Sequence, residues 1–267
     1  MNGPLLRHTL RSNAVRLLVI SAGLALMGVL MPVMFATFGQ EVGEFVESVP
    51  LLSQFKNFGG GDLFSLTGSL ALGFSHPFTL LLLGIMAVAY PALAIAGERD
   101  KGTLEVTLSR PISREGLLLT LYGAGLVFIG LLVAVLLVSS TITTYAVGLG
   151  HELELAHALQ LWLAGSLLFV AFMSLTFAVS VGSDRAAPAI GIPAVIILLS
   201  YLVWAIASIW PDVHWLGEYS VFNLLKAQET LDDGLVVPDV LLLLVLSVGF
   251  LALALYRFPL RDLPAPS

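Results

Sequence analysis

Six long apolar segments, separated by short polar ones, dominate the pattern of hydrophobic and polar positions along the chain. No segment carries a charged side chain in its interior, and each is close to the length of about 20 residues that a helix needs to cross the hydrocarbon core of a membrane. The pattern therefore predicts an all-α integral membrane protein with six transmembrane helices in a single transmembrane domain, residues 1–267. The predicted spans are residues 17–40, 74–96, 117–138, 159–181, 187–210 and 239–256.

Two stretches next to these spans have patterns of their own. Residues 63–73 are uncharged and are expected to form a short helix or turn that leads into the second span. Residues 1–16 place Leu6 and Leu10 on one side of a helical projection, with arginines beside them. This arrangement is typical of an amphipathic helix that lies on the membrane surface. A plain basic flank of the first span is an equal alternative.

The composition supports a membrane protein and excludes several kinds of chemistry. The chain is 58% hydrophobic and 11% charged, whereas soluble domains carry about 25% charged residues. It has no cysteine, which excludes disulfides, thiolate catalysis and cysteine-based metal sites. No basic stripe with interleaved aromatic residues is present, so nucleic acid is not an expected partner.

The distribution of basic residues predicts the orientation of the spans. Ten of the twelve Lys and Arg residues lie in the segments before the first span, after the second, after the fourth and after the sixth. The other two, Lys56 and Lys226, lie in the segments on the opposite side. Basic residues are enriched in cytoplasmic loops. We therefore expect both termini in the cytoplasm and a multi-pass protein of the cell membrane.

The densest run of charge, residues 98–115, lies between the second and third spans. It holds four Lys or Arg residues and four acids. Gly97 is expected to end the preceding helix in a left-handed conformation, which glycine adopts at low cost. Gly102 and Thr103 then offer a turn and an N-cap for a short helix.

The short helix that follows is predicted to be amphipathic. Glu105 would lie in its first turn, where the helix dipole favours an acid, and Leu104 and Leu108 would share one face. Pro111 should stop this helix, and Ser113 can cap the next one. A short amphipathic helix with charges of both signs, held at the membrane, is typical of a docking element for another protein.

The sequence from Glu98 to Arg114, ERDKGTLEVTLSRPISR, resembles the loop after the second transmembrane helix of type-2 ATP-binding cassette (ABC) permeases. The family pattern is roughly E-R-E-x-G-T-L-E-x-L-L-x-x-P-[IV]-x-R. Two positions depart from it, since Asp100 stands where Glu is usual and Thr107 where Leu is usual. The specific match covers about seventeen residues, and elsewhere the resemblance rests on the number and spacing of apolar spans.

The resemblance implies a coupling helix that sits in a cleft of a separate ATPase subunit. It also implies a second permease subunit, in a homodimer or a heterodimer, with ATP and Mg²⁺ bound by the ATPase and no cofactor bound by this chain. The residues expected at the ATPase interface are Glu98, Arg99, Asp100, Lys101, Gly102, Thr103, Leu104, Glu105, Leu108, Arg110 and Pro111.

The chemistry that the sequence lacks agrees with this interpretation. No charged residue lies deep in a span, which argues against coupling of transport to protons or ions. None of the three lysines belongs to a phosphate-binding loop, and no Gly-x-Ser-x-Gly or His-Glu-x-x-His motif occurs. No catalytic residue and no metal site are therefore expected. His76 lies at membrane depth, where packing is favoured over contact with a substrate.

These observations predict the membrane-spanning permease subunit of an ABC transporter, an exporter whose uncharged interior favours hydrophobic or amphipathic cargo. Three alternatives remain at this stage. The loop could be an ordinary solvated connector, the chain could be an intramembrane enzyme that modifies lipids, or it could be a non-transporting assembly scaffold. Membrane lipids surround the protein in every case.

Overall fold

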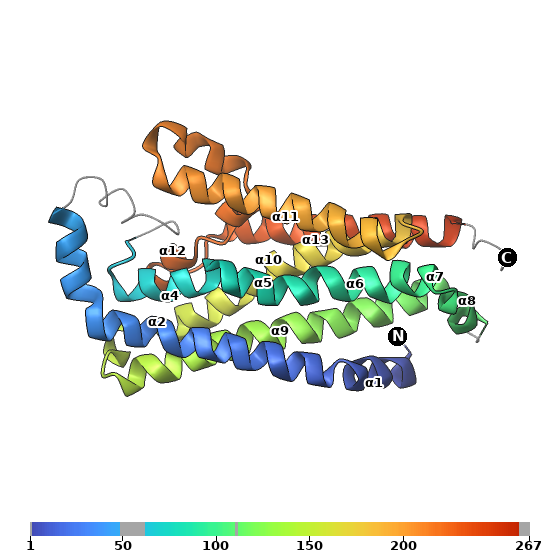
Figure 1. Cartoon of the computed structure of the whole chain (residues 1–267), viewed down its shortest axis with the longest axis horizontal. Coiled ribbons are helices and arrows are strands. Elements are labelled where there is room, and N and C mark those ends of the chain that lie inside the picture. Colours follow the sequence, from blue (N-terminus) through green and yellow to red (C-terminus); the bar gives the residue numbers. More distant parts are fainter. Residues whose placement is uncertain (1, 49–61, 110–111, 262–267) are drawn as a thin grey trace.

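The computed structural model describes residues 2–48, 62–109 and 112–261, and every regular element in these ranges is a helix. Six helices are long and apolar enough to cross a membrane, which confirms the predicted all-α fold. They run side by side along the long axis of the molecule (Figure 1). They are α2 (Ala14–Ser48), the composite second span (Pro77–Asp100), α9 (Arg114–Ala146), α10 (Leu155–Gly182), α11 (Ala186–Ile209) and α13 (Val237–Leu260).

The second span is the least regular of the six. Two π-helical turns flank its short central helix, which contains Pro91. Proline has no backbone N–H and cannot continue the hydrogen-bond ladder, and π-helical turns are a common way to accommodate such a break. In chain order the span consists of α5 (Pro77–Gly84), η2 (Ile85–Ala89), α6 (Tyr90–Ala92), η3 (Leu93–Gly97) and α7 (Glu98–Asp100).

A short helix precedes the second span, as predicted. Helix α4 (Leu66–Ser75) is capped by Ser65, whose side chain accepts a hydrogen bond from the backbone of Gly68 at 3.0 Å. The chain then turns at His76, where Nδ1 accepts from the backbone N–H of Phe78 at 3.2 Å and so caps α5. The second span therefore begins at Pro77 rather than at residue 74, because the turn at His76 separates α4 from α5.

Several helices in the structure extend beyond the spans that the sequence predicted. Helix α9 was expected to end at residue 138 but continues to Ala146. Its last turns are rich in hydroxyl groups, which bond to carbonyls one turn back: Thr143 donates to Ser139 at 2.8 Å and Thr144 to Ser140 at 2.9 Å. A helix continues as long as its backbone hydrogen bonds are made, whereas a hydropathy pattern ends where polar residues begin.

Helix α10 lies at the centre of the bundle. It packs against α9, α11 and α13, and side chains along its length, including Leu168, Met173 and Phe177, are fully buried. Short helical segments lie at the end of the bundle near α4: η4 (Gly150–Glu152), η5 (Pro211–Tyr219), η6 (Val221–Leu224) and α12 (Ala227–Asp232). Of these, α12 packs against α4 and α10, whereas η5 packs against α11.

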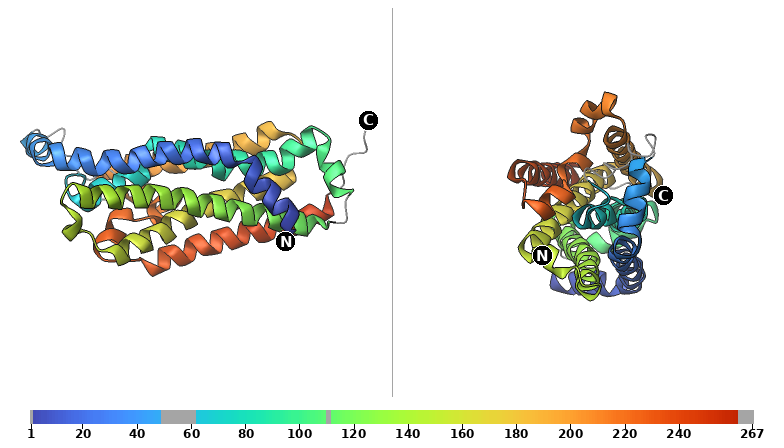
Figure 2. Two further views of the ribbon diagram at one scale, coloured as in Figure 1. Left: turned by 90° about the horizontal axis from the view of Figure 1, so that it is seen from below. Right: turned by 90° about the vertical axis from the view of Figure 1, so that its left-hand side faces the viewer.

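The N-terminal helix α1 (Gly3–Ser12) and the short helix α8 (Thr103–Leu108) lie at the opposite end, together with the last turn of α13 (Figures 1 and 2). Helix α1 crosses the outside of the bundle at an angle to α9 (Figure 2). The described ends of the chain and the loop that resembles a coupling helix therefore share one end of the molecule, which we call the α8 end.

Candidate functional site

The candidate docking loop begins one turn later than the sequence indicated. Gly97 was expected to end the second span in a left-handed conformation, but its φ is −66° and the helix continues through it to Asp100. Lys101 donates its backbone N–H to the carbonyl of Gly97 at 3.3 Å. The left-handed residue is Gly102, with φ +69°, where a side chain would be strained. The turn predicted at Gly102 is therefore confirmed, and the prediction for Gly97 was wrong. The expected N-cap at Thr103 was also wrong, since Gly102 holds that position and no side chain caps α8.

The apolar face of α8 packs on the protein itself. Leu104 is only 2% exposed and belongs to the hydrophobic core, and Leu108 and Ile112 pack partly buried against that core. At the start of α8, the hydroxyl of Thr103 donates to the Glu98 carboxylate at 2.6 Å, which ties α8 back to the end of the second span. The helix is thus held on the bundle by contacts within this chain.

The opposite face of α8 is open. Lys101, Gly102 and Thr103 are exposed, and Val106 is 64% exposed. Glu105 is half-buried in the first turn, as predicted. We call these residues the outward face of α8.

The far side of the loop is described in part. Arg110 and Pro111 lie outside the described residues, so the expected stop at Pro111 stays a prediction. The next helix begins as expected: Ser113 caps α9 by accepting a hydrogen bond from the backbone of Gly116 at 3.0 Å, and Glu115 lies in the first turn.

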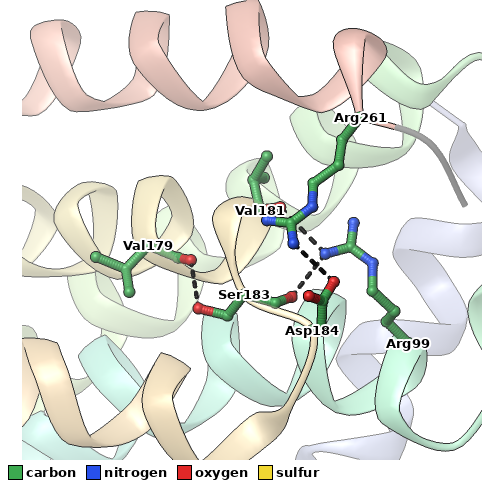
Figure 3. Close-up of polar contacts among 6 residues, drawn as sticks. All are labelled: Arg99, Val179, Val181, Ser183, Asp184 and Arg261. Atoms are coloured by element: carbon green, nitrogen blue, oxygen red, sulfur yellow. Dashed lines mark hydrogen bonds and ion pairs between the residues drawn. The ribbon is translucent and has the colours of Figure 1, made fainter. Parts of the chain in front are cut away.

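Arg99 is expected at the ATPase interface but is only 7% exposed and points into the bundle. Its Nη1 donates to the carbonyl of Val181 at 3.1 Å and to that of Ser183 at 2.6 Å (Figure 3). The last carbonyls of a helix have no partner within it and carry partial negative charge, so a cation is favoured there. Arg99 therefore fastens the end of the second span to the C-terminus of α10.

Two further contacts surround this attachment. Arg261, just after α13, forms an ion pair with Asp184 at 2.7 Å (Figure 3). Asp100 accepts a hydrogen bond from the backbone N–H of Ala186, the first residue of α11, at 3.2 Å. We call Arg99, Asp100, Asp184 and Arg261 the arginine clamp. It joins the second span, the turn between α10 and α11, and the end of α13.

Arg114 extends these connections to α9. Its Nη1 donates to the carbonyls of Phe258 and Pro259, each at 3.2 Å, and to that of Arg261 at 2.5 Å. It thus caps the C-terminus of α13 from the start of α9. Arg114 thus ties α9 directly to the end of α13, whereas α7 is connected to α13 through the end of α10 and the turn after it, which Arg99 and Arg261 both contact.

One hydroxyl group forms hydrogen bonds with backbone groups around the break in the second span. Ser180 of α10 is fully buried. Its Oγ lies 3.1 Å from the carbonyl of Pro91 and 3.2 Å from that of Ala92, and it accepts from the backbone N–H of Ala96 at 3.1 Å. These backbone groups belong to the irregular stretch around Pro91. A side chain from the neighbouring helix therefore supplies partners that the span itself lacks.

An apolar groove runs between the second span and α11. Its volume is about 410 Å³, and Tyr201 is the one lining residue whose side chain carries a polar group. Residues that line it include Leu80, Leu81 and Val88 from the second span and Ile190, Ile197 and Tyr201 from α11. The groove and the docking loop thus lie on the same span.

The sequence predicted the loop but not the residues outside it that anchor it. Residues 183–185 lie between two predicted spans, and neither Ser180 nor Arg261 was predicted to have a role. Their partners are 77 to 89 positions away in the chain, so local patterns carry no signal for them. Within the described ranges, no group of three or more His, Cys, Asp or Glu residues is arranged to hold a metal ion.

Comparison with known proteins agrees with the family resemblance of the loop between the second and third spans. A model of the family described as "ABC-2 family transporter protein" matches residues 6–263, nearly the whole chain. A search of curated proteins found no match. With six apolar spans, the protein is a multi-pass membrane protein. The family match establishes that this chain belongs to the ABC-2 transporter family as a membrane subunit.

Proposed function

We propose that this chain is the permease subunit of an ABC exporter in the cell membrane, driven by a separate ATPase subunit that docks on the outward face of α8. The observation that carries the proposal is the two-sided character of this helix. One side is anchored in the core through Leu104, and the other presents Lys101, Thr103 and Val106 to the surroundings. A helix that is packed on the bundle through one face and open on the other can transmit a push, whereas a solvated connector cannot.

The attachments of the loop support a mechanical role. A force on α8 reaches the second span through the bond between Thr103 and Glu98, and it reaches α10, α11 and α13 through the arginine clamp. The second span also lines the apolar groove. Movement of the docked ATPase would therefore change the groove without any nucleotide bound to this chain, and ATP with Mg²⁺ would be held by the partner.

The lining of the groove supports the proposal that the cargo is hydrophobic or amphipathic. The groove is lined almost entirely by hydrocarbon, which suits a hydrophobic or amphipathic molecule. A second permease subunit, identical or paralogous, would face this one across the route that the cargo takes through the membrane. Both termini would lie in the cytoplasm, since the α8 end must meet the ATPase. No observation favours a lipid-modifying enzyme or a scaffold over this function.

The proposal is tested by binding of the ATPase subunit to variants of the outward face of α8. Val106→Asp and Glu105→Arg change exposed or half-buried side chains. Gly102→Pro removes the left-handed turn, because proline fixes φ near −65°. Each variant should insert normally and lose at least about tenfold in affinity in a pull-down of the ATPase subunit, which corresponds to about 1.4 kcal/mol.

The matched control is Glu152→Arg, a charge reversal of an exposed residue at the opposite end of the bundle. It should bind the ATPase subunit like the unmodified chain. If Val106→Asp, Glu105→Arg and Gly102→Pro all bind like the control, α8 is a connector and the docking proposal is wrong.

A further inference from the structure

The orientation of α1 is set by its contacts with α9. Leu5, Leu6 and Leu10 pack against the hydrophobic core, and Thr9 is buried. At the start of the helix the backbone N–H of Asn2 donates to the hydroxyl of Thr120 in α9 at 2.9 Å. The apolar side of α1 is therefore covered by the protein, not by the hydrocarbon of the membrane as a free amphipathic helix would require.

The side of α1 that remains open is basic. Arg7, His8 and Arg11 are exposed, and so is Arg16 in the first turns of α2. We call these four residues the basic face. Within the described ranges, no acidic side chain pairs with any of its arginines, and Arg16 only donates to the side-chain oxygen of Asn13 at 3.2 Å. The sequence contains no acid before Glu41.

The residues that follow place the basic face at the edge of the membrane. Val15 is 76% exposed and Leu18 is 72% exposed on the first turns of α2, on the outside of a helix that spans the membrane. Arg16 directly follows Val15 in the first turn of α2, and Arg11 lies three residues before that helix begins. Arg16, which has no acidic partner among the described residues, therefore lies within one turn of side chains that face hydrocarbon. This places the start of α2, and the end of α1 that leads into it, at the depth of lipid headgroups.

We propose that the basic face of α1 binds the phosphate groups of anionic phospholipids in the leaflet at the α8 end. Arginine suits this ligand because its guanidinium group matches a phosphate with two parallel hydrogen bonds. Basic residues beside a transmembrane helix attract anionic lipids by about fivefold each. Two phosphates from separate lipids or one shared phosphate would satisfy Arg7 and Arg11, which share one side of α1 at a spacing of four residues.

The experiment measures which lipid touches the basic face. The chain has no cysteine, so Ser12→Cys, an exposed and nearly isosteric change next to Arg11, gives a single attachment point for a fluorophore. The labelled chain, without an ATPase subunit, is placed in nanodiscs that contain brominated phosphatidylglycerol or brominated phosphatidylcholine at equal mole fraction. Quenching by the anionic lipid should exceed quenching by the zwitterionic lipid at least about fivefold, and the excess should fall as salt is added.

Three variants identify the residues. Arg7→Gln with Arg11→Gln should abolish the excess quenching, and Arg7→Lys with Arg11→Lys should retain most of it. Arg185→Gln, which removes an exposed arginine at the same end but outside α1, should leave the excess unchanged.

Two results would overturn the proposal. Equal quenching by the two lipids would show contact with the membrane without selection for charge. The absence of quenching by either lipid would show that the basic face points to water and is free for an acidic surface of a protein partner. Neither result depends on docking of the ATPase at α8, so failure here and failure of the docking proposal are distinguishable.

Discussion

Helices α10 and α11 are neighbours of similar hydropathy with opposite surroundings. The most apolar stretch of α10 has a mean hydropathy of 2.0, and 78% of its residues are buried. The corresponding stretch of α11 has a mean hydropathy of 2.4, but only 17% of its residues are buried. The helix with the greater hydropathy is the one that the protein covers less. Hydropathy thus predicts which segments enter the membrane but not which of them face protein and which face lipid.

The difference lies in the size and polarity of the side chains. Ser174, Thr176 and Ser180 of α10 are fully buried, and the Ser174 hydroxyl lies 2.8 Å from that of Tyr122 in α9. Leu198 and Leu199 of α11 are more than half exposed. Lipid tails are as apolar as leucine, so close packing and hydrogen bonds, rather than hydrophobicity, select the central helix.

The largest expected effect concerns packing on α10. Phe177 is fully buried, with its ring centroid 5.7 Å from that of Tyr122 and 6.3 Å from that of Tyr90. Phe177→Ala should lower the free energy of unfolding by about 3–5 kcal/mol, because it leaves a cavity. Leu199→Ala on α11 should change it by less than about 0.5 kcal/mol. Unfolding of the purified chain in mixed micelles measures both, and equal losses would contradict the contrast between the two helices.

The second effect concerns the arginine clamp, where α10 is tied to the second span. Arg99→Gln removes a cation that donates to two carbonyls at the end of α10, and it should cost about 1.5–3 kcal/mol of unfolding free energy. Arg185 lies at the start of α11 and is exposed, so Arg185→Gln should have almost no effect. Both variants are measured in the same unfolding assay. A loss for Arg185→Gln as large as that for Arg99→Gln would show that charge at this end, rather than the clamp, is what matters.

The buried position of Arg99 also shows how much of the site could be predicted from the sequence. The motif predicted a short helix after Gly102, and the structure contains α8 there. The same motif assigned Arg99 and Leu104 to the ATPase interface, yet both side chains are buried within this chain. A pattern of residue types indicates that a leucine or an arginine needs a partner. It does not indicate whether the partner is a neighbouring helix or another protein.

The irregular second span lay beyond sequence reasoning for a related reason. Pro91 could be located within an apolar run, but hydropathy treats such a run as a straight helix. Backbone groups of Pro91, Ala92 and Ala96 in this irregular stretch bond to a hydroxyl group from α10, 84 to 89 positions away. The six spans followed from the local hydropathy of each segment, because membrane insertion depends on each segment separately. Their arrangement depends on pairs of segments.

The smallest effect isolates the polar contact that holds the irregular span against α10. Ser180→Ala leaves the carbonyls of Pro91 and Ala92 and the N–H of Ala96 without the hydroxyl that bonds to them. Hydrogen bonds between transmembrane helices contribute about 0.6 kcal/mol on average and at most about 1.7 kcal/mol, so the loss of unfolding free energy should fall in this range. Amide exchange at Ala96 should accelerate at the same time, since this N–H loses its acceptor.

Ser247→Ala on α13 is the matched control for this last prediction. Ser247 is also buried, but its hydroxyl donates to the carbonyl of Leu243 in its own helix at 2.7 Å. That carbonyl already accepts a backbone bond in a regular helix, so the substitution removes a buried hydroxyl without orphaning a backbone group. Exchange at Ala96 should remain unchanged in this variant. If Ser180→Ala leaves the exchange rate at Ala96 as slow as Ser247→Ala does, the irregular span is held by packing alone, and the hydroxyl groups of α10 do not explain its central position.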